Sequence, residues 1–399
     1  MDRGRPSLLP LEDSHTTVPT VLFFHFDEHR VCYGREAINE YVTGADGRQM
    51  RSLKRILGSE LLYEKTRLGK SSVALADVIG MFIRELKQRA ENQVGDAIDN
   101  VVLGRPVKFV ANDPSADARA QQELEAITRR AGFRQVEFEF EPIAAAMVYQ
   151  SQLREDAIAL IVDAGGGTSD FSIVELAPAI DASATRASRI LASHGVRIGG
   201  TDFDAALALS SVMPLLGYHA PLGRGGTVMP SWIYGDLTTW QKVNFLYTHS
   251  LSRMVAELRE LCTAPHLVDR LARVLRLRLG HYILMAVEGA KIDLTSQAVA
   301  SCELDAIEEN LRLSLTSADL ENAIGREMQD IFDGVSETVR SAGLTPDRIE
   351  KIFTTGGSTA IPAIREWIEA TFPLARIVEG DRFGSVGMGL ALEAHRRFS

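Results

Sequence analysis

The segment that decides the fold runs from Asp163 to Asp170 and reads D-A-G-G-G-T-S-D. It follows the apolar run Ala157–Val162, typical of a strand buried on both faces, and it precedes Phe171–Leu176, the next expected strand. Glycines between two strands let backbone N–H groups approach phosphate oxygens, because glycine has no side chain and tolerates positive φ. We therefore predict that the turn binds the phosphates of a nucleotide through its glycines, Gly165, Gly166 and Gly167.

Polar side chains flank these glycines. Asp163 ends the first strand, Asp170 begins the second, and Thr168 adds a hydroxyl. Carboxylates in such places can hold Mg²⁺ through its waters, for which Asp163 is our candidate, or orient an attacking water. The alternative is a glycine-rich hairpin whose aspartates only stabilise the turn. Two carboxylates around an all-glycine centre favour the phosphate site.

Composition narrows the class of protein. A length of 399 residues predicts two or more lobes, and 45% apolar with 24% charged residues is ordinary for a globular protein. A net charge of -10 argues against a general binder of nucleic acid or membrane surfaces. The cysteines Cys32, Cys262 and Cys302 form no C-x-x-C pair, which predicts neither a disulfide framework nor a zinc site. Residues 1–6 show no signal pattern, and no apolar run could span a membrane, so we expect a cytoplasmic protein. We also expect it to be a monomer.

Strand-like and helix-like segments alternate along the chain, which favours an α/β architecture. Upstream of the turn, the pattern predicts strands at Val18–Phe24, Arg30–Tyr33, Val101–Phe109 and Gln135–Phe140, and helices at Arg35–Tyr41, Ser71–Gln93, Ala116–Ala131 and Pro142–Gln150. Downstream, it predicts a loop at Gly217–Tyr234, helices at Thr238–Leu261 and Pro265–Leu294, a hairpin of Gln297–Leu304 with Leu311–Leu315, a helix from Thr316 to Ala342, a strand at Lys351–Thr354, and helices at Pro362–Ala370 and from Ser385.

The glycine turn and three further segments together resemble the superfamily of actin, sugar kinases and heat-shock ATPases. The closest resemblance is to the seventy-kilodalton heat-shock (Hsp70, DnaK-type) chaperones. F-E-P-I-A-A-A from Phe140 is similar to the family's connecting motif E-P-x-A-A-A, and G-G-S-T-A-I-P from Gly356 is similar to its adenosine motif G-G-S-T-R-I-P. E-G-A-K from Glu288, with Thr295 behind it, is similar to the family's E-x-A-K-x-x-L-S helix. The segments occur in the family's order, and the resemblance covers nearly the whole chain.

The resemblance implies an actin-like ATPase fold with two ribonuclease-H-like lobes around a nucleotide cleft. The lobes would span residues 1–155, with a peripheral subdomain at about 25–100, and residues 156–399, with a helical insertion at about 217–310. The chain stops after the last helix, which we expect to close the second lobe, so no peptide-binding domain is expected. The stand-alone length, the insertion and L-G-R-P-V from Leu103 look most like the YegD-like branch of chaperone relatives.

Roles for single residues follow from the same resemblance, with ATP or ADP and Mg²⁺ as the implied ligands. Glu141 would face the two aspartates and help orient the water–magnesium cluster, and Lys54 would reach the γ-phosphate. Glycines and polar residues would contact the rest of the nucleotide: Gly199, Gly200, Glu288, Lys291, Thr295, Gly356, Gly357 and Ser358. Plainer alternatives are a glutamate favoured by a helix start, a solvated lysine, a helix cap at Asp202 and a surface ion pair of Glu288 with Lys291.

The sequence departs from the family's pattern in two ways. Ile292 and Ala360 stand where the family has arginines, the first of which stacks on adenine; losing these contacts removes roughly 1–2 kcal/mol each, so base selectivity should be weak. No D-x-G-T phosphate loop precedes residues 4–24, which resemble the third strand onward of the family's first lobe. The resemblance therefore implies a first lobe without its first β-hairpin. We expect the natural product to start upstream of Met1, at a start codon other than the assigned one; if Met1 is the true start, the first lobe is truncated and hydrolysis is impaired.

Three functions fit these observations. The first is an ATP-binding, chaperone-like protein of the stress response, a slow Mg²⁺-dependent ATPase switch whose state is read by an unknown protein partner or client. The second is a pseudo-ATPase that senses nucleotide and acts as an interaction module. The third, minor one is a small-molecule kinase of the same superfamily.

Overall fold

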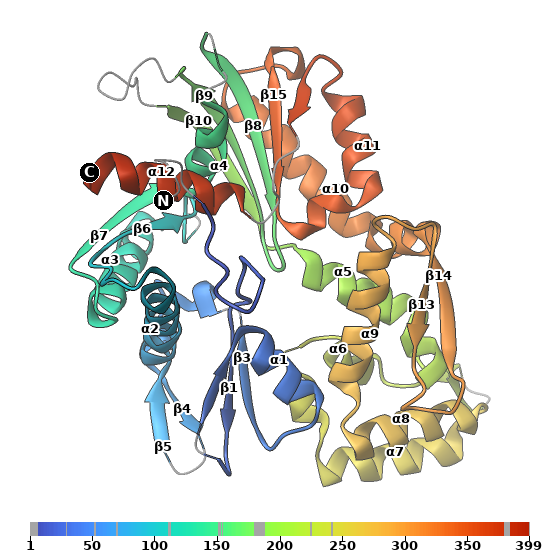
Figure 1. Ribbon diagram of the computed structural model, residues 1–399. Helices are drawn as coiled ribbons and strands as arrows, with labels where there is room; N and C mark the ends of the chain where they lie inside the picture. Colours follow the sequence, from blue (N-terminus) through green and yellow to red (C-terminus); the bar gives the residue numbers. More distant parts are fainter. Residues whose placement is uncertain are drawn as a thin grey trace.

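A mixed β-sheet carries the glycine turn in the computed structural model. The structure describes residues 7–28, 30–51, 53–68, 71–110, 113–150, 153, 155–178, 188–223, 226–240, 242–378 and 384–398. Residues 1–6, in which no signal pattern was found, lie outside the described residues. Within this part of the chain, the sheet has five strands in the order β10-β9-β8-β15-β16 (Figure 1). They are β8 (Ala157–Ala164), β9 (Ser169–Leu176), β10 (Arg189–Val196), β15 (Lys351–Thr355) and β16 (Arg376–Val378).

Both faces of this sheet are covered, and alternate side chains of its central strand β8 pack into different apolar clusters. Leu160 and Val162 of β8 share one apolar cluster with residues of α10 (Ser317–Ser341), whereas Ala159 and Ile161 share another with residues of α4 (Glu141–Gln150). Strands buried on both faces read as continuous apolar runs, which is how β8 was predicted. The sheet is therefore a fixed platform, and its β8–β9 turn projects from a rigid layer.

The other α/β half is built differently. Its described strands form small separate sheets with the orders β2-β1-β3, β4-β5 and β6-β7. The strands are β1 (Val21–His25), β2 (Val31–Tyr33), β3 (Gly47–Arg51), β4 (Lys65–Leu68), β5 (Ser71–Ala74), β6 (Asn100–Arg105) and β7 (Gln135–Phe140). They are joined by α1 (Gly34–Val42), α2 (Leu75–Val94), α3 (Pro114–Arg130) and the 3-10 helices η1 (Leu53–Ile56) and η2 (Glu60–Tyr63).

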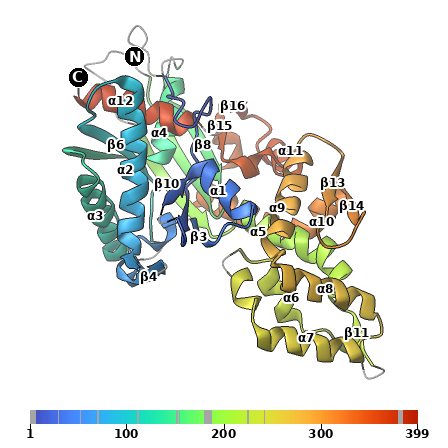
Figure 2. The same ribbon diagram turned by 60° about the horizontal axis from the view of Figure 1, so that its bottom comes forward.

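A mostly helical segment lies at the end of the molecule far from α2 and α3 (Figure 2). Its helices are α6 (Ser231–Leu237), α7 (His249–Leu261), α8 (Pro265–Leu277) and α9 (Gly280–Asp293), with the 3-10 turn η5 (Val243–Leu246). α5 (Gly200–Leu207), η3 (Ala208–Val212) and η4 (Met213–Leu216) lead into it through the short pair β11 (Pro221–Leu222) and β12 (Thr227–Val228). The hairpin β13 (Val299–Glu303) with β14 (Arg312–Thr316), η6 (Pro346–Arg348), η7 (Gly357–Ala360), α11 (Pro362–Thr371) and α12 (Ser385–Phe398) complete the chain.

We expected the last helix to close the second lobe, but the structure places it elsewhere. α12 packs on α4 and on β6 of the first lobe. Gly389 permits this contact, because a Cβ there would lie 1.8 Å from the carbonyl oxygen of Ala144 in α4. Arg397 adds an ion pair with Glu139 of β7 at 2.9 Å. Residues 384–398 therefore belong with the first lobe, although they end the chain.

Several predicted elements differ from the structure for local reasons. Ser71–Ala74 is a strand rather than the first turn of a helix, because it pairs with β4. The strand predicted to reach Phe109 ends at Arg105, before a proline that cannot donate to a sheet. The predicted helix Pro265–Leu294 is two helices, broken where Arg278 adopts a left-handed φ of 56°.

The region predicted as one helix, Thr238–Leu261, also divides. α6 ends at Leu237, and α7 begins only after Thr248, whose hydroxyl accepts a hydrogen bond from the Leu251 N–H at 3.2 Å. This threonine is an N-cap, which fixes the helix start by satisfying an exposed backbone donor. Part of the loop predicted at Gly217–Tyr234 is ordered as β11, β12 and the start of α6.

Candidate functional site

Strand register puts both aspartates of the glycine turn on one face. Asp163 and Asp170 are directly opposed Cα partners in the antiparallel pair β8–β9. Opposed residues of an antiparallel pair project to the same side of the sheet. The turn itself is closed by the Gly165 N–H, which donates to the Thr168 carbonyl at 2.9 Å. The two carboxyl groups therefore stand together at the base of a tight backbone loop.

The start of α5 holds the turn from one side. The Gly200 N–H donates to the Gly165 carbonyl at 2.9 Å, and the Thr201 N–H donates to the Gly166 carbonyl at 2.8 Å. A Cβ on Gly199 would lie 2.4 Å from the nitrogen of Gly167, so only glycine allows this approach. The predicted residues Gly199 and Gly200 thus lie against the turn. Asp202 is also the helix cap that we considered, because its carboxylate accepts a hydrogen bond from the Gly199 N–H at 2.8 Å at the start of α5.

The Gly356 segment supports the turn from the other side. Gly356 has a φ of 81°, and a Cβ there would lie 2.3 Å from the Ala164 carbonyl oxygen. The Ser358 hydroxyl donates to the Gly165 carbonyl at 3.1 Å, and Gly357 opens the 3-10 helix η7 between them. These residues were predicted to contact the adenosine of a nucleotide. In the structure, Gly356 and Ser358 brace the turn from behind.

Glu141 completes a cluster of carboxyl groups at the turn. It begins α4, and its charge raises the pKa of both Asp163 and Asp170. Burial is the larger cause for each: the pKa of Asp163 rises to about 7 and that of Asp170 to about 6. Lys54 of η1 is ion-paired with Glu141 and lowers both pKa values in part, while the Thr168 hydroxyl bonds to Asp170. The predicted catalytic residues lie together.

The cluster lies in a cleft of about 660 Å³ between the two lobes and the helical segment. The first lobe contributes Pro19, Thr20, Val21, Ile38, Tyr41, Gln49, Arg51, Lys54, Pro106, Lys108 and Phe109. The first residue of α4, the glycine turn and the segments downstream of it contribute Glu141, Asp163, Gly165, Gly166, Gly167, Thr168, Asp170, Thr201, Trp240, Met285 and Glu288. Both walls carry polar and apolar side chains, as ligand sites do.

The predicted nucleotide-contacting residues of α9 differ in where they lie relative to the cleft. Glu288 lines the cleft, but Lys291 is buried behind it, where its ammonium is 2.7 Å from Asp204 and donates to the Gly200 carbonyl at 3.1 Å. Burial raises the pKa of Asp204 to about 6, an effect that Lys291 opposes. Lys291 is therefore neither a surface partner of Glu288 nor a residue that lines this cleft. The Thr295 hydroxyl bonds to the Ile292 carbonyl beyond the end of α9, also away from the lining.

Sequence reasoning missed an aromatic contact across the cleft. Tyr41 of α1 hydrogen-bonds to Nδ1 of His281, and the two rings pack edge to face with centroids 4.7 Å apart. The ring of Trp240 lies 4.8 Å from that of His281, with the Arg51 guanidinium 4.5 Å above the indole. Single aromatic residues on separate elements carry no sequence signal. Thr201, by contrast, could have been found from its place directly after Gly199-Gly200.

The comparison with protein families agrees with this geometry. Residues 60–212 and 276–395 match the family described as Hsp70 protein, which is more than half of the chain. The stretch between the two matched segments contains α6, α7 and most of α8. No helix in the part of the chain that the structure describes is long and apolar enough to cross a membrane. The chain belongs to the Hsp70 family and carries its nucleotide-binding, chaperone-type ATPase domain with an actin-like fold.

Proposed function

We propose that this protein is a chaperone-type switch that binds ATP with Mg²⁺ and hydrolyses it slowly. The observation that carries the proposal is the carboxyl cluster of Asp163, Asp170 and Glu141 beside a glycine turn, in a cleft large enough for a nucleotide. Like charges and burial raise the pKa of both aspartates. A divalent cation would favour their ionised forms, so the donor set fits Mg²⁺.

Backbone geometry supports the turn as the phosphate cradle. The Gly165 carbonyl accepts from the Gly200 N–H and the Ser358 hydroxyl, so it points away from the cleft. In a trans peptide unit the C=O and the next N–H point in opposite directions. The Gly166 N–H therefore faces the cleft side of the turn, where a phosphate oxygen would accept its hydrogen bond.

Lys54 and Glu141 have different roles in this proposal: Lys54 binds the terminal phosphate and Glu141 orients water. The Lys54 side chain is 51% exposed and ion-paired with Glu141, on the wall opposite the turn. Such a lysine can exchange its carboxylate partner for a terminal phosphate, and Glu141 is then left to orient water with Asp163 and Asp170. Magnesium held through water at Asp163 would supply charge neutralisation between the phosphates. The Thr168 hydroxyl hydrogen-bonds to Asp170 and partly opposes the rise in the pKa of that carboxyl group.

The nucleoside half of the cleft is less selective in this proposal. Glu288 is the α9 residue on the cleft wall, where it can accept hydrogen bonds from ribose hydroxyls. Ile292, 56% exposed, cannot stack on a base as an arginine does. We therefore expect ATP and other nucleoside triphosphates to bind with similar affinity. An unknown protein partner or client would read the open or closed state of the lobes.

Titration of the full chain with Mg²⁺ and ATP by calorimetry tests binding. We expect one site, weakened in Gly166→Val, because a side chain on the turn blocks phosphate approach. Single-turnover hydrolysis then tests turnover: phosphate release by the wild type should be lost in Asp170→Asn and kept in Asp305→Asn. Asp305 is a matched control, because its carboxylate bonds to the Asn310 N–H in the distant β13–β14 hairpin. Absence of nucleotide binding would refute the proposal.

A nucleotide-sensing pseudo-ATPase is the second candidate, favoured by the exposed Ile292 in place of a stacking arginine. It predicts binding without phosphate release in the same assays.

The helical residues between the matched family segments are part of the insertion on which our proposed placement in the YegD-like branch rests. A monomeric state and a cytoplasmic location complete the proposal.

A further inference from the structure

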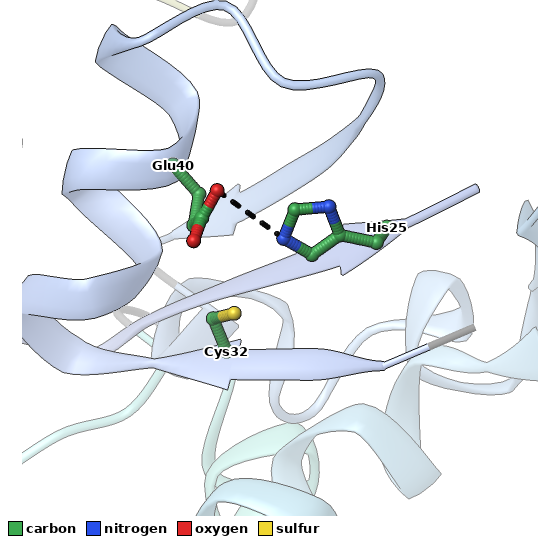
Figure 3. Close-up of side chains that lie close together, drawn as sticks. All are labelled: His25, Cys32 and Glu40. Atoms are coloured by element: carbon green, nitrogen blue, oxygen red, sulfur yellow. Dashed lines mark ion pairs between the residues drawn. The ribbon is translucent and has the colours of Figure 1, made fainter. Parts of the chain in front are cut away.

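A second group of metal-ligating side chains lies in the first lobe, away from the glycine turn. His25 ends β1, Cys32 lies in the middle of β2, and Glu40 is in α1, which packs on both strands (Figure 3). One ligand atom of each, an imidazole nitrogen, the thiol sulfur and a carboxylate oxygen, lies within 4.8 Å of the others. Cysteine spacing along the sequence gave no sign of this group, because its members come together only when α1 folds onto the strands.

Burial sets this group apart from a surface cluster. Cys32 is 0% exposed and His25 is 8% exposed. The buried Nε2 of His25 has no hydrogen-bond partner among the described residues, although it is 3.5 Å from the Glu40 carboxylate. A buried polar atom without a hydrogen bond costs about 1–3 kcal/mol. The nitrogen faces the Glu40 carboxylate without a hydrogen bond to it, so both atoms are free to serve as ligands of a cation.

One side of the group is apolar, whereas Arg30 and Glu36 lie on the other. Phe23 and Ala37, both 0% exposed, pack with Cys32 in one cluster, and the Phe23 ring lies edge-on to His25 with centroids 4.8 Å apart. Apolar walls exclude water and strengthen the attraction between a cation and its ligands. Such a shell is typical of a structural metal site, which the chain would gain at little cost to its core.

We propose that His25, Cys32 and Glu40 bind a divalent transition-metal ion of the zinc class, with a water in the fourth position. Nitrogen, sulfur and carboxylate ligands together suit Zn²⁺, whereas Mg²⁺ takes oxygen ligands only. Tetrahedral zinc needs ligand atoms about 3.5 Å apart, so the group must contract by about 1 Å. Glu40 lies on a helix surface and its side chain can make that movement.

The Arg30 guanidinium competes with a metal ion for two of the proposed ligands, Cys32 and Glu40. Its guanidinium bonds to the Cys32 sulfur at 2.8 Å and to the Glu36 and Glu40 carboxylates at 2.7 Å each. The side chain is 41% exposed, so it can leave Cys32 and Glu40 and keep Glu28 and Glu36. The charges then balance: the metal is offset by the Cys32 thiolate and the Glu40 carboxylate, and Arg30 by its other partners. The thiol proton passes to solvent when the metal binds.

The site would act on the cleft through α1. Glu40 precedes Tyr41, the residue that lines the nucleotide cleft and bonds to His281. A metal that fixes Glu40 to β1 and β2 would therefore fix the position of Tyr41 as well. The ion is a structural element in this proposal, and it takes no part in chemistry at the carboxyl cluster.

Metal titration of the untagged full chain tests the proposal. After dialysis against a chelator, we expect the wild type to take up one Zn²⁺ per chain in competition with a chromogenic chelator. Cys32→Ser and His25→Gln should each weaken uptake by roughly tenfold or more, because each removes one ligand of three. Cys302→Ser, which alters another buried cysteine, is the matched control and should bind like the wild type.

Two further measurements keep the test decisive even if a variant folds poorly. Arg30→Gln should tighten binding, because it removes the competing guanidinium and leaves every proposed ligand in place. Co²⁺ bound to the wild type should show the absorption of a thiolate ligand in a tetrahedral site. The proposal is overturned if the wild type takes up no stoichiometric metal, if Cys32→Ser binds as well as the wild type, or if the cobalt spectrum shows no thiolate.

Discussion

The two lobes present very different walls to the same cleft. In the second lobe, the β8–β9 turn grows from a continuous sheet whose faces are both covered, and backbone hydrogen bonds from α5 and a serine hydroxyl hold it in place. In the first lobe, the described strands form small separate sheets, and the cleft side chains come from the start of β1, α1, β3, η1 and the loop after β6. The difference teaches that the turn is held by backbone hydrogen bonds at the end of a continuous sheet, whereas the first-lobe wall is assembled from side chains on several small elements.

Contacts between the walls follow the same division. The β8–β9 turn offers backbone groups and short carboxylates, whereas the first lobe offers long side chains such as Lys54 and Arg51. Long side chains lose rotamer freedom when they meet a partner, as Lys54 does with Glu141 and Arg51 does with Trp240.

The largest effect is expected where the rigid wall is most crowded. Gly356→Ala should lower the free energy of unfolding by about 3 kcal/mol or more, since it combines left-handed strain with a Cβ against the Ala164 carbonyl. Gly343→Ala is the matched control: its φ of 69° is similar, but a Cβ there meets nothing within 4 Å. It should cost only about 1 kcal/mol. Urea denaturation of both variants measures the difference, and equal costs would show that the turn is not tightly braced.

Next in size is the buried ion pair behind the turn. Lys291→Met should cost about 2–3 kcal/mol in denaturation at pH 8, because Asp204 is left buried without its cation. The cost should shrink toward pH 5, where the raised pKa of Asp204 lets it take up a proton. Lys242→Met removes the exposed pair with Asp236 and should cost less than about 0.5 kcal/mol. A small cost for Lys291→Met would mean that the pair does not brace α5.

A gain in stability is expected at the carboxyl cluster. The pKa of Asp163 is about 7 when folded, above its ordinary value of 3.8, so the folded chain binds more protons and loses stability as pH rises between these values. Asp163→Asn removes this loss. In chelator-containing buffer it should be more stable than the wild type by about 2 kcal/mol above pH 7 and equally stable near pH 4.

The same carboxyl group supplies its own controls. Asp305→Asn, in the β13–β14 hairpin, should show no such pH-dependent gain. Mg²⁺ with nucleotide should stabilise the wild type and reduce the advantage of Asp163→Asn, because the ligand repays the repulsion. If Asp163→Asn destabilises the chain at pH 8, the carboxyl cluster is not a strained metal-binding arrangement.

The smallest effect concerns the contact between the lobes. Tyr41→Phe removes the hydroxyl that bonds to His281 and should cost about 1 kcal/mol, since the partner nitrogen stays buried. Tyr282→Phe is the control, because its hydroxyl bonds to the Glu303 carbonyl at the surface. Thermal unfolding of both variants gives the comparison. A cost no larger than the control's would show that the aromatic contact does not hold the first lobe against the helical segment.

The sequence by itself determined the rigid half of the site. Asp163 and Asp170 come from one continuous strand–turn–strand segment, so their distance along the chain dictates their register and shared face. The apolar run of β8 is long and uninterrupted, which is a strong local signal. Glu141 was found because it belongs to a recognisable motif at the start of a helix.

Only the tertiary structure decided the rest. Among the strands missed from the sequence, β3, β10 and β16 lie at sheet edges, where partial exposure weakens the alternation of apolar residues. The other missed strands, β4, β5, β11 and β12, form two-stranded sheets in which every strand is an edge. Lys291 reads as a surface or ligand-binding lysine, yet it is buried against Asp204. Tyr41 and His281 are 240 residues apart and meet only across the folded cleft. Local pattern reports the burial of a segment, whereas the partner of a side chain depends on which distant element packs against it.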